Sequence, residues 1–390
     1  MRASNPTVLS MMALHPCKFG SMEEAIVLLS RAICEAGGRS IVVFKSAVPP
    51  ALQPFYQVTG TTTEVLASSS RGGTRVAFYR GLFRLIRKYR PDVVHVHFHE
   101  QFSILPVLLA MAGVPRVVFT DHYRVPSQLS SPTRLQLRLW NLLVPPVFGT
   151  TLLAVSDHVK RTLIRDYKVS PRRVRTVRNG VNPQRFRPGT AEDKQKLRAA
   201  HQLPTAGPIV LTVAALVPEK GVGDLLTAAR HVLAACPDAT FLVIGEGSLA
   251  GTLRDQAREA EIEKNLRFLG MQGDVSDFMR LADVVVVPSV WQEPAGLATI
   301  EAMASGRPVV ATRVGGIPEY LGEGAGILVE PKSPQQMASA IVTLLQSPSV
   351  ADSMGHEGRR IVEQQFSLDR WVDNILDVYE ICRAPRAQAV

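Results

Sequence analysis

The chain has 390 residues, of which 46% are hydrophobic and 20% are charged. This length exceeds what one hydrophobic core needs and suits two domains of ordinary size. No run of 18 apolar residues occurs, so we expect no transmembrane helix. The first residues lack the apolar core of a signal peptide, and the four scattered cysteines form no C-x-x-C pair. We therefore expect a cytoplasmic globular protein with reduced thiols.

The formal net charge of +10 is distributed unevenly. Residues 1–190 hold 26 Lys and Arg against 9 Asp and Glu, a net charge of +17, whereas the rest hold 18 against 25, a net charge of −7. A basic first half attracts phosphates or anionic lipid headgroups. The acidic second half and the lack of any zinc-finger or RNA-binding signature argue against nucleic acid as a partner.

Short apolar runs rich in β-branched residues alternate with longer amphipathic stretches. The strands expected from these runs cover 41–44, 93–97, 116–120, 152–155, 209–213, 240–244, 284–287 and 308–311. The helical patterns between them include 21–36, 224–235, 249–260 and 335–346. Continuous apolar strands suit a parallel sheet that is covered on both faces. The sequence therefore predicts an α/β protein with doubly wound sheets.

The alternation breaks between residues 182 and 207, where Pro183, Pro188, Pro204 and Gly207 surround a short charged segment. This break predicts an N-terminal domain at 1–187, a linker at 188–206 and a second domain at 207–365. Two Rossmann-like domains that face a cleft would place ligand sites at the carboxyl ends of their strands.

Two features of the first half allow more than one interpretation. Residues 74–90 mix Arg80, Arg84 and Arg87 with aromatic and aliphatic side chains, which fits a helix with a basic solvent face or a surface that contacts anionic lipid. His95, His97 and His99 alternate, so all three would project to one face. With Glu100 they could form a metal site, or His97 and Glu100 could shape one side of the cleft.

The strongest signal is ADVVVVPSVWQEPAGLATIEAMASGRPVVATRVGGIPE, residues 282–319. A buried strand leads to a loop and then to a helix that we expect to open near Pro294 and to end at Gly306. The backbone amides of Ala295, Gly296 and Leu297 would then form an anion site at the helix N-terminus. Glu293 would lie at that opening, and Glu301 about 12 Å further along the helix axis.

This segment resembles glycosyltransferase family 4, the retaining glycosyltransferases of the GT-B fold, because Glu293 and Glu301 reproduce the family's E-x7-E motif. Further segments are similar to the family in the same order: VRNGVN at 177–182, VAALVPEKGVGDLL at 213–226, VIGEGSL at 243–249 and FLG at 268–270. The resemblance covers nearly the whole chain and is densest after Val177. It implies two Rossmann-like domains facing a central cleft, with a C-terminal helix within 366–390 that crosses back to the first domain.

The resemblance also implies roles for residues. Glu293 would contact the donor sugar, Glu301 the ribose hydroxyls, and the amides of Ala295, Gly296 and Leu297 the diphosphate. Lys220 would pair with the phosphates, and Gly245 would approach the donor. The G-x-G of VIGEGSLAG is otherwise only a near miss to a dinucleotide fingerprint, and we reject that interpretation.

One position departs from the family, which usually carries an arginine five residues before the lysine, where this chain has Ala215. Arg313 or Arg178 could substitute for it, or Lys220 and the helix amides could suffice. We expect activity to be retained because the rest of the motif is intact.

In the first domain, FTDHYR at 119–124 resembles the family's T-x-H-G segment, which places His122 near the donor's anomeric centre. Gly20 remains where the family carries a Gly-Gly pair, and it would approach the diphosphate closely. The family carries a similar VHAH strand end without binding metal, so no metal and no cofactor are expected.

The resemblance predicts a retaining hexosyltransferase that uses a nucleotide-sugar donor, in cell-surface polysaccharide or glycolipid synthesis. A carbohydrate or lipid-linked acceptor is the expected partner, with possible peripheral contact to an anionic membrane. The alternatives are a sugar-nucleotide epimerase or a phosphorylase on the same fold, or a binding-only protein that has lost catalysis with the arginine.

Overall fold

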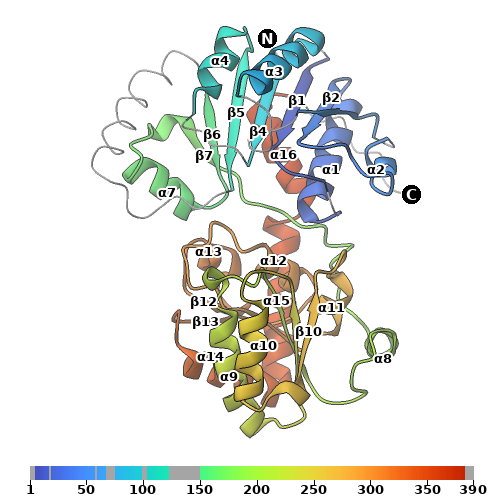
Figure 1. Ribbon diagram of the computed structural model, residues 1–390, viewed down its shortest axis with the longest axis vertical. Helices are drawn as coiled ribbons and strands as arrows, with labels where there is room; N and C mark the ends of the chain where they lie inside the picture. Colours follow the sequence, from blue (N-terminus) through green and yellow to red (C-terminus); the bar gives the residue numbers. More distant parts are fainter. Residues whose placement is uncertain are drawn as a thin grey trace. The chain divides into compact units, whose positions relative to one another are not determined.

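The computed structural model describes residues 5–16, 19–57, 59–66, 75–98, 103–122 and 150–382. The chain divides into two compact units, shown in Figure 1. Unit 1 consists of Met1–Arg178 and Leu368–Val390, and unit 2 is the continuous stretch Asn179–Ser367. The chain therefore passes between the units at two places.

Unit 1 contains a parallel sheet of seven strands in its described residues. The strands are β1 (Thr7–Met12), β2 (Arg39–Phe44), β3 (Thr62–Val65), β4 (Val93–His97), β5 (Arg116–Asp121), β6 (Thr151–Ala154) and β7 (Val174–Thr176). Their order is β3-β2-β1-β4-β5-β6-β7, so the chain starts in the middle and winds outwards in both directions. This order is the doubly wound arrangement that the alternating pattern predicts.

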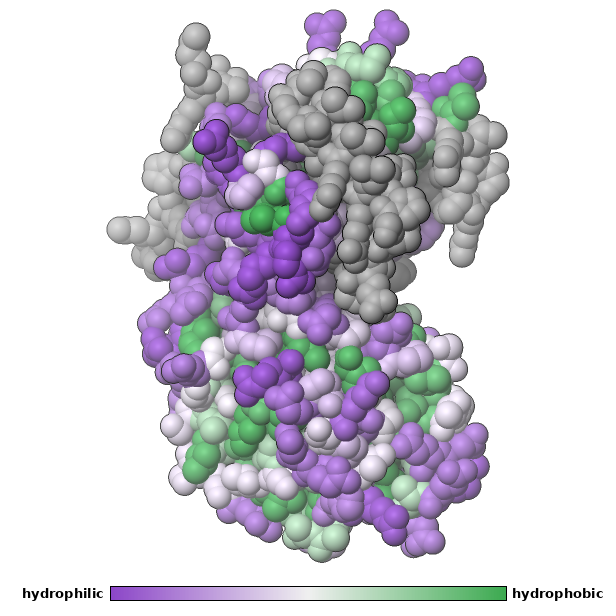
Figure 2. Space-filling model, turned by 90° about the vertical axis from the view of Figure 1, so that its left-hand side faces the viewer, coloured by the Kyte–Doolittle hydropathy of each residue, from purple (hydrophilic) through white to green (hydrophobic). Residues whose placement is uncertain are grey.

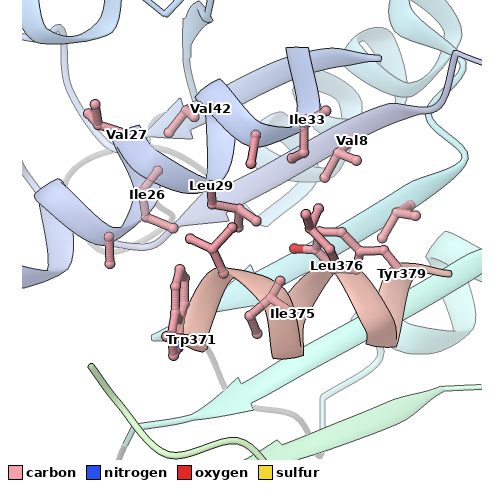
Figure 3. Packing of buried hydrophobic residues seen from close by; sticks show 14 of the residues in the cluster. Val8, Ile26, Val27, Leu29, Ile33, Val42, Trp371, Ile375, Leu376 and Tyr379 are labelled. Atoms are coloured by element: carbon pink, nitrogen blue, oxygen red, sulfur yellow. The ribbon is translucent and has the colours of Figure 1, made fainter. Parts of the chain in front are cut away.

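Helices cover the sheet of unit 1. They are α1 (Ser21–Glu35), α2 (Gln53–Gln57), α3 (Arg75–Tyr89), α4 (Leu105–Met111), α7 (Asp157–Arg165) and α16 (Leu368–Tyr379). The last of these helices comes from the far end of the chain and packs on α1, as Figure 3 shows. Trp371, Ile375 and Leu376 share one buried cluster with Ile26 and Leu29 of α1. Each such apolar side chain stabilises the fold by about 1.5–3 kcal/mol. The predicted crossing of the C-terminal helix to the first unit is confirmed.

Unit 2 contains a parallel sheet of six strands. The strands are β8 (Ile209–Val213), β9 (Thr240–Ile244), β10 (Leu266–Gly270), β11 (Val284–Val287), β12 (Val309–Thr312) and β13 (Gly326–Val329), in the order β10-β9-β8-β11-β12-β13. The helices are α8 (Ala191–Ala200), α9 (Val222–Ala235), α10 (Ala250–Glu259), α11 (Ser276–Leu281), α12 (Leu297–Ala304), α13 (Ile317–Leu321), α14 (Pro334–Gln346) and α15 (Pro348–Gln365). The α/β prediction therefore holds for both units.

The stretch predicted as a linker holds a helix. Thr190 caps α8 by accepting from the amide of Asp193 at 3.0 Å, and the Asp193 carboxylate accepts from the amide of Thr190 in return. The chain passes from unit 1 to unit 2 at Arg178–Asn179, before this helix. The division into an acceptor-side domain and a donor-side domain remains a prediction about function.

Among the described helices, none combines the length and the apolar character that a bilayer crossing requires. On the face of unit 2 that Figure 2 shows, hydrophobic side chains form small groups among hydrophilic ones. Scattered exposed apolar residues of this kind are normal for a protein surface.

Candidate active site

The loop after β8 brings Lys220 to the loop after β11. Lys220 ends a short 3-10 turn, Pro218–Lys220, and Gly221 follows in the left-handed region with φ +63°. A Cβ atom at Gly221 would lie 2.0 Å from the carbonyl oxygen of Pro288, so the two loops meet backbone to backbone. The amide of Val290 donates to the carbonyl of Glu219 at 2.9 Å and ties the loops together. Only glycine permits this approach.

Three side chains converge on the carboxylate of Glu293. The Nζ atom of Lys220 lies 2.6 Å from Oε1 and 2.8 Å from Oε2. The indole N–H of Trp291 donates to Oε2 at 2.7 Å, and the hydroxyl of Ser289 donates to the same oxygen at 3.0 Å. Glu293 is 9% exposed, so these donors replace most of its hydration. The Lys220 ammonium also lies 5.6 Å from the centroid of the Trp291 ring, within cation–π range.

The helix after this cluster begins later than the sequence predicts. It starts at Leu297, and Gly296 is its N-cap residue with φ +75°. Residues 293–296 are therefore not helical, so the prediction of a helix from Pro294 is wrong, and the distance of about 12 Å along its axis does not apply. Glu301 lies four residues into the helix, about 6 Å from its first residue. Proline starts no helix here because Gly296 adopts a left-handed conformation that turns the chain first.

A glycine pair outside the predicted site residues, Gly315 and Gly316, contacts the backbone of Glu293. Gly315 has φ +56°, and a Cβ atom there would lie 2.0 Å from the carbonyl oxygen of Glu293. The amide of Gly316 donates to that same carbonyl at 2.7 Å. The signal was present in the sequence as VGGIPE at 314–319, directly after a strand. Adjacent glycines at a strand end indicate a close backbone approach.

Gly245, a predicted donor-binding residue, is explained by packing between loops. Its φ is +139°, and a Cβ atom would lie 1.9 Å from the carbonyl oxygen of Ala214. The amide of Leu216 donates to the carbonyl of Glu246 at 2.9 Å. The G-x-G of this segment therefore fits the loop after β9 against the loop after β8. A role for Gly245 in donor binding remains a prediction.

The position of the absent arginine, Ala215, is exposed in the loop after β8. Both suggested substitutes are engaged elsewhere. Arg313 pairs with Glu330 at 3.2 Å, and Arg178, which belongs to unit 1, pairs with Asp157 at 2.6 Å. Lys220 is thus the cation that the described contacts join to Glu293.

In unit 1, the strand ends of β4 and β5 bring three histidines together. His95 and His97 are fully buried on β4 with ring centroids 3.8 Å apart, which confirms that they share a face. Nδ1 of His97 lies 3.2 Å from Nε2 of His122, the residue after β5. Lost hydration lowers the pKa of His95 and of His122 to about 3 and holds the pKa of His97 well below its usual value. All three rings are therefore neutral at pH 7.

Gly20, His99 and Glu100 are further residues of unit 1 for which the sequence suggests a role. Gly20 precedes α1, and its amide donates to the carboxylate of Glu23 at 3.0 Å, so this amide already has a partner. His99 and Glu100 lie outside the described residues. Across the part of the chain that the structure describes, no three His, Cys, Asp or Glu side chains are placed to hold a metal ion together.

Comparisons with known proteins match both units. Residues 193–361 match the model "Glycosyl transferases group 1", and residues 22–185 match "Glycosyltransferase Family 4". The chain is 31% identical over 363 residues to D-inositol 3-phosphate glycosyltransferase 2 of Catenulispora acidiphila, covering 84% of this chain and 82% of that protein.

Two further examples are a relative from Escherichia coli and a solved structure from Anabaena. One is the UDP-Gal:alpha-D-GlcNAc-diphosphoundecaprenol alpha-1,3-galactosyltransferase of Escherichia coli, 26% identical, with 76% of this chain and 77% of that protein covered. The other is the crystal structure of Anabaena HepE in complex with UDP-glucose, which has a TM-score of 0.76 at 20% identity and covers 96% of this chain and 100% of that chain. Together with the two parallel sheets, these matches show the GT-B fold. The chain belongs to glycosyltransferase family 4, the group 1 glycosyl transferases.

Proposed function

We propose that the chain is a retaining glycosyltransferase that moves a hexose-type sugar from a nucleotide-sugar donor to an acceptor hydroxyl. The observation that carries the proposal is the contact of Lys220 with Glu293 beside the N-terminus of α12. A fixed cation and backbone amides at one strand end suit a substrate that carries negative charge next to sugar hydroxyls.

In this proposal unit 2 binds the donor. The diphosphate lies at the start of α12, where the amides of Ala295, Gly296 and Leu297 and the ammonium of Lys220 attract it. Glu293 accepts hydrogen bonds from the sugar hydroxyls, and Glu301, which is 9% exposed, holds the ribose. The names of two similar proteins mention UDP-galactose and UDP-glucose, which supports a nucleotide sugar as the donor class.

The reaction breaks the bond between the anomeric carbon and the phosphate oxygen, and the nucleoside diphosphate leaves. The acceptor oxygen forms the new bond on the face that the phosphate leaves, and a donor phosphate oxygen takes the acceptor's proton. Lys220 and the helix amides stabilise the charge on the leaving group. His122 orients a donor oxygen near the anomeric centre. No metal or cofactor is part of this proposal because the protein's own cation and amides supply the positive charge.

The acceptor is proposed to be a carbohydrate or a lipid-linked sugar used for cell-surface polysaccharide or glycolipid. The name of the E. coli relative includes a GlcNAc-diphosphoundecaprenol, which supports this acceptor class. Helix α3 supplies a matching surface: Val76, Arg80, Arg84 and Arg87 are exposed along one stripe, whereas Leu82, Leu85 and Ile86 are buried. We propose that this stripe rests on the anionic face of the cytoplasmic membrane.

A thermal-shift panel of UDP- and GDP-sugars, followed by product analysis with a radiolabelled donor, tests the function. We expect a nucleotide sugar to raise the melting temperature of the protein. We also expect the label to be transferred to an acceptor with retained anomeric configuration. Interconversion of the donor without acceptor would instead indicate an epimerase, and phosphate-dependent release would indicate a phosphorylase. Binding without turnover across acceptors would indicate a protein that only binds.

A further inference from the structure

The histidines of β4 differ in how their ring nitrogens are bonded. In His95, Nδ1 lies 2.5 Å from the Tyr379 hydroxyl and Nε2 lies 2.6 Å from the Thr120 hydroxyl, so both nitrogens have partners. In His97, Nδ1 contacts Nε2 of His122, whereas Nε2 is buried and has no hydrogen-bond partner. His95 is a satisfied core histidine. His97 contacts the predicted functional histidine with one nitrogen, whereas its other nitrogen is buried without a hydrogen-bond partner.

The contact between His97 and His122 needs one hydrogen between two ring nitrogens. Because both rings are neutral, each carries a single N–H, and two arrangements are possible. In the first, His97 Nδ1–H donates to His122 Nε2, and the bare Nε2 of His97 is the buried atom. In the second, His122 Nε2–H donates to His97 Nδ1, and His97 must bury an N–H with no acceptor.

The first arrangement is favoured because, in folded proteins, a buried N–H group without an acceptor is rarer than a buried acceptor without a donor. It fixes the proton of His122 on Nδ1, the nitrogen that faces away from His97. Among the described contacts of His122, none involves this Nδ1.

The neighbouring backbone also holds the His122 ring. Phe98 follows His97 with φ +56°, an unusual conformation for a residue with a side chain. Its ring stacks on that of His122, with centroids 4.3 Å apart and an interplanar angle of 15°. Backbone strain that is retained beside a candidate site often serves to position a group.

We propose that His97 is a positioning residue that fixes the tautomer of His122, so that His122 presents Nδ1–H as a hydrogen-bond donor to an oxygen of the sugar substrate. His122 then orients the substrate and takes no proton from the acceptor. The functional half of this inference rests on the proposed function, whereas the tautomer itself does not.

Ring nitrogen shifts in uniformly 15N-labelled protein at pH 7 report the tautomer directly. We expect the Nδ1–H pattern for His122, assigned by its loss in His122→Asn. In His97→Leu the pure Nδ1–H pattern should disappear. His97→Asn, whose amide nitrogen can replace Nδ1 as a donor, should restore it. An Nε2–H pattern in the native protein, or an unchanged pattern in His97→Leu, overturns the inference.

A control is Ile33→Val on α1, which disturbs the core of the same unit and should leave the His122 pattern unchanged. In activity assays, His122→Asn keeps a donor at the Nδ1 position and His122→Gln does not. We therefore expect His122→Asn to retain about tenfold more kcat/KM than His122→Gln. Equal or reversed values contradict a role for Nδ1–H. If no nucleotide sugar stabilises unit 2 while the His122 pattern is as expected, the proposed function is contradicted and the tautomer inference is not.

Discussion

The ammonium of Lys220 lies within 2.8 Å of both carboxylate oxygens of Glu293, although the two residues are 73 positions apart in the chain. The side chains are 24% and 11% exposed, so water screens this ion pair only weakly. Each partner therefore depends on the other for its orientation and for its charge balance.

Replacing Lys220 by Met should lower turnover at least about 100-fold, because the leaving group loses a fixed cation. It should also lower the free energy of unfolding by about 1–3 kcal/mol, since the Glu293 carboxylate stays buried with fewer donors. Adding Glu293→Gln should recover part of that stability and no turnover. Urea unfolding and initial rates measure both effects. Additive stability losses with near-native turnover would show that the pair has no such role.

Trp291→Phe removes the indole N–H and keeps an aromatic ring beside Lys220. We expect kcat/KM for the donor to fall about tenfold, because one hydrogen bond to a buried carboxylate is lost. Trp371→Phe, the same substitution in the core of unit 1, is the control and should lower stability without changing donor affinity. Identical donor kinetics in native protein and Trp291→Phe would contradict this prediction.

Gly221→Ala should destabilise the protein by about 2–4 kcal/mol, because a Cβ atom would meet the Pro288 carbonyl at 2.0 Å in a left-handed conformation. Gly251→Ala is the matched control. It lies in α10 with nothing within 4 Å of its added Cβ atom, so its effect should be within about 1 kcal/mol and stabilising. Chemical denaturation compares the two. Equal denaturation midpoints for Gly221→Ala and Gly251→Ala would show that the two loops that meet at Gly221 can move apart without loss of stability.

Stability should fall as pH drops below about 6.5. Unfolded histidine takes a proton near pH 6.5, whereas the folded-state pKa of His95 and of His122 is about 3. The unfolded state therefore binds more protons between these values, and the stability present above pH 6.5 is lost towards pH 3, by at most about 1.4 kcal/mol per pH unit for each histidine. In His95→Gln the loss between pH 7 and pH 5 should be smaller. Urea unfolding at each pH measures this. If the free energy of unfolding fell equally with pH in the native protein and in His95→Gln, His95 would not contribute to the pH dependence.

Changing Arg80, Arg84 and Arg87 to Gln should reduce sedimentation with vesicles that contain anionic lipid, because each basic residue near such a surface contributes about 1 kcal/mol. The reduction should shrink as salt is raised. Unchanged sedimentation of the triple variant at low salt would end the membrane proposal.

The control for that experiment removes the same charge from unit 2 and should leave sedimentation unchanged. Three arginines on the exposed surface suit it: Arg230, Arg254 and Arg267.

The sequence predicted the central strands well, because parallel strands buried on both faces are continuous apolar runs. The observed strands β4, β8, β9 and β11 have the predicted limits. It missed β1, whose TVLSMM interrupts the apolar run with serine and has few β-branched residues. It indicated β10 only through the FLG segment at its end. It also missed β3, β7 and β13, which are only three or four residues long. Such short segments acquire strand structure from their neighbours in the sheet.

Around Glu293, the sequence indicated which residues form the candidate site but not the contacts between them. The motif indicated Glu293 and Lys220, but not that they form a direct ion pair, nor that Trp291 and Ser289 complete it. These contacts depend on the close approach of two loops at Gly221, which no local pattern encodes. Likewise, alternation placed His95 and His97 on one face, whereas the contact of His97 with His122 depends on the pairing of β4 with β5.

The position of α16 affects the order in which the protein can fold during synthesis. Residues of unit 1 up to Arg178 leave the ribosome first, but their core lacks Trp371, Ile375 and Leu376 until about 190 further residues of unit 2 have been made. Unit 2 is continuous, so we expect it to fold before unit 1 is complete. A chain ending at Ser367 should keep unit 2 resistant to protease and leave the residues before Arg178 sensitive. A helix that is made after unit 2 thus completes the core of unit 1.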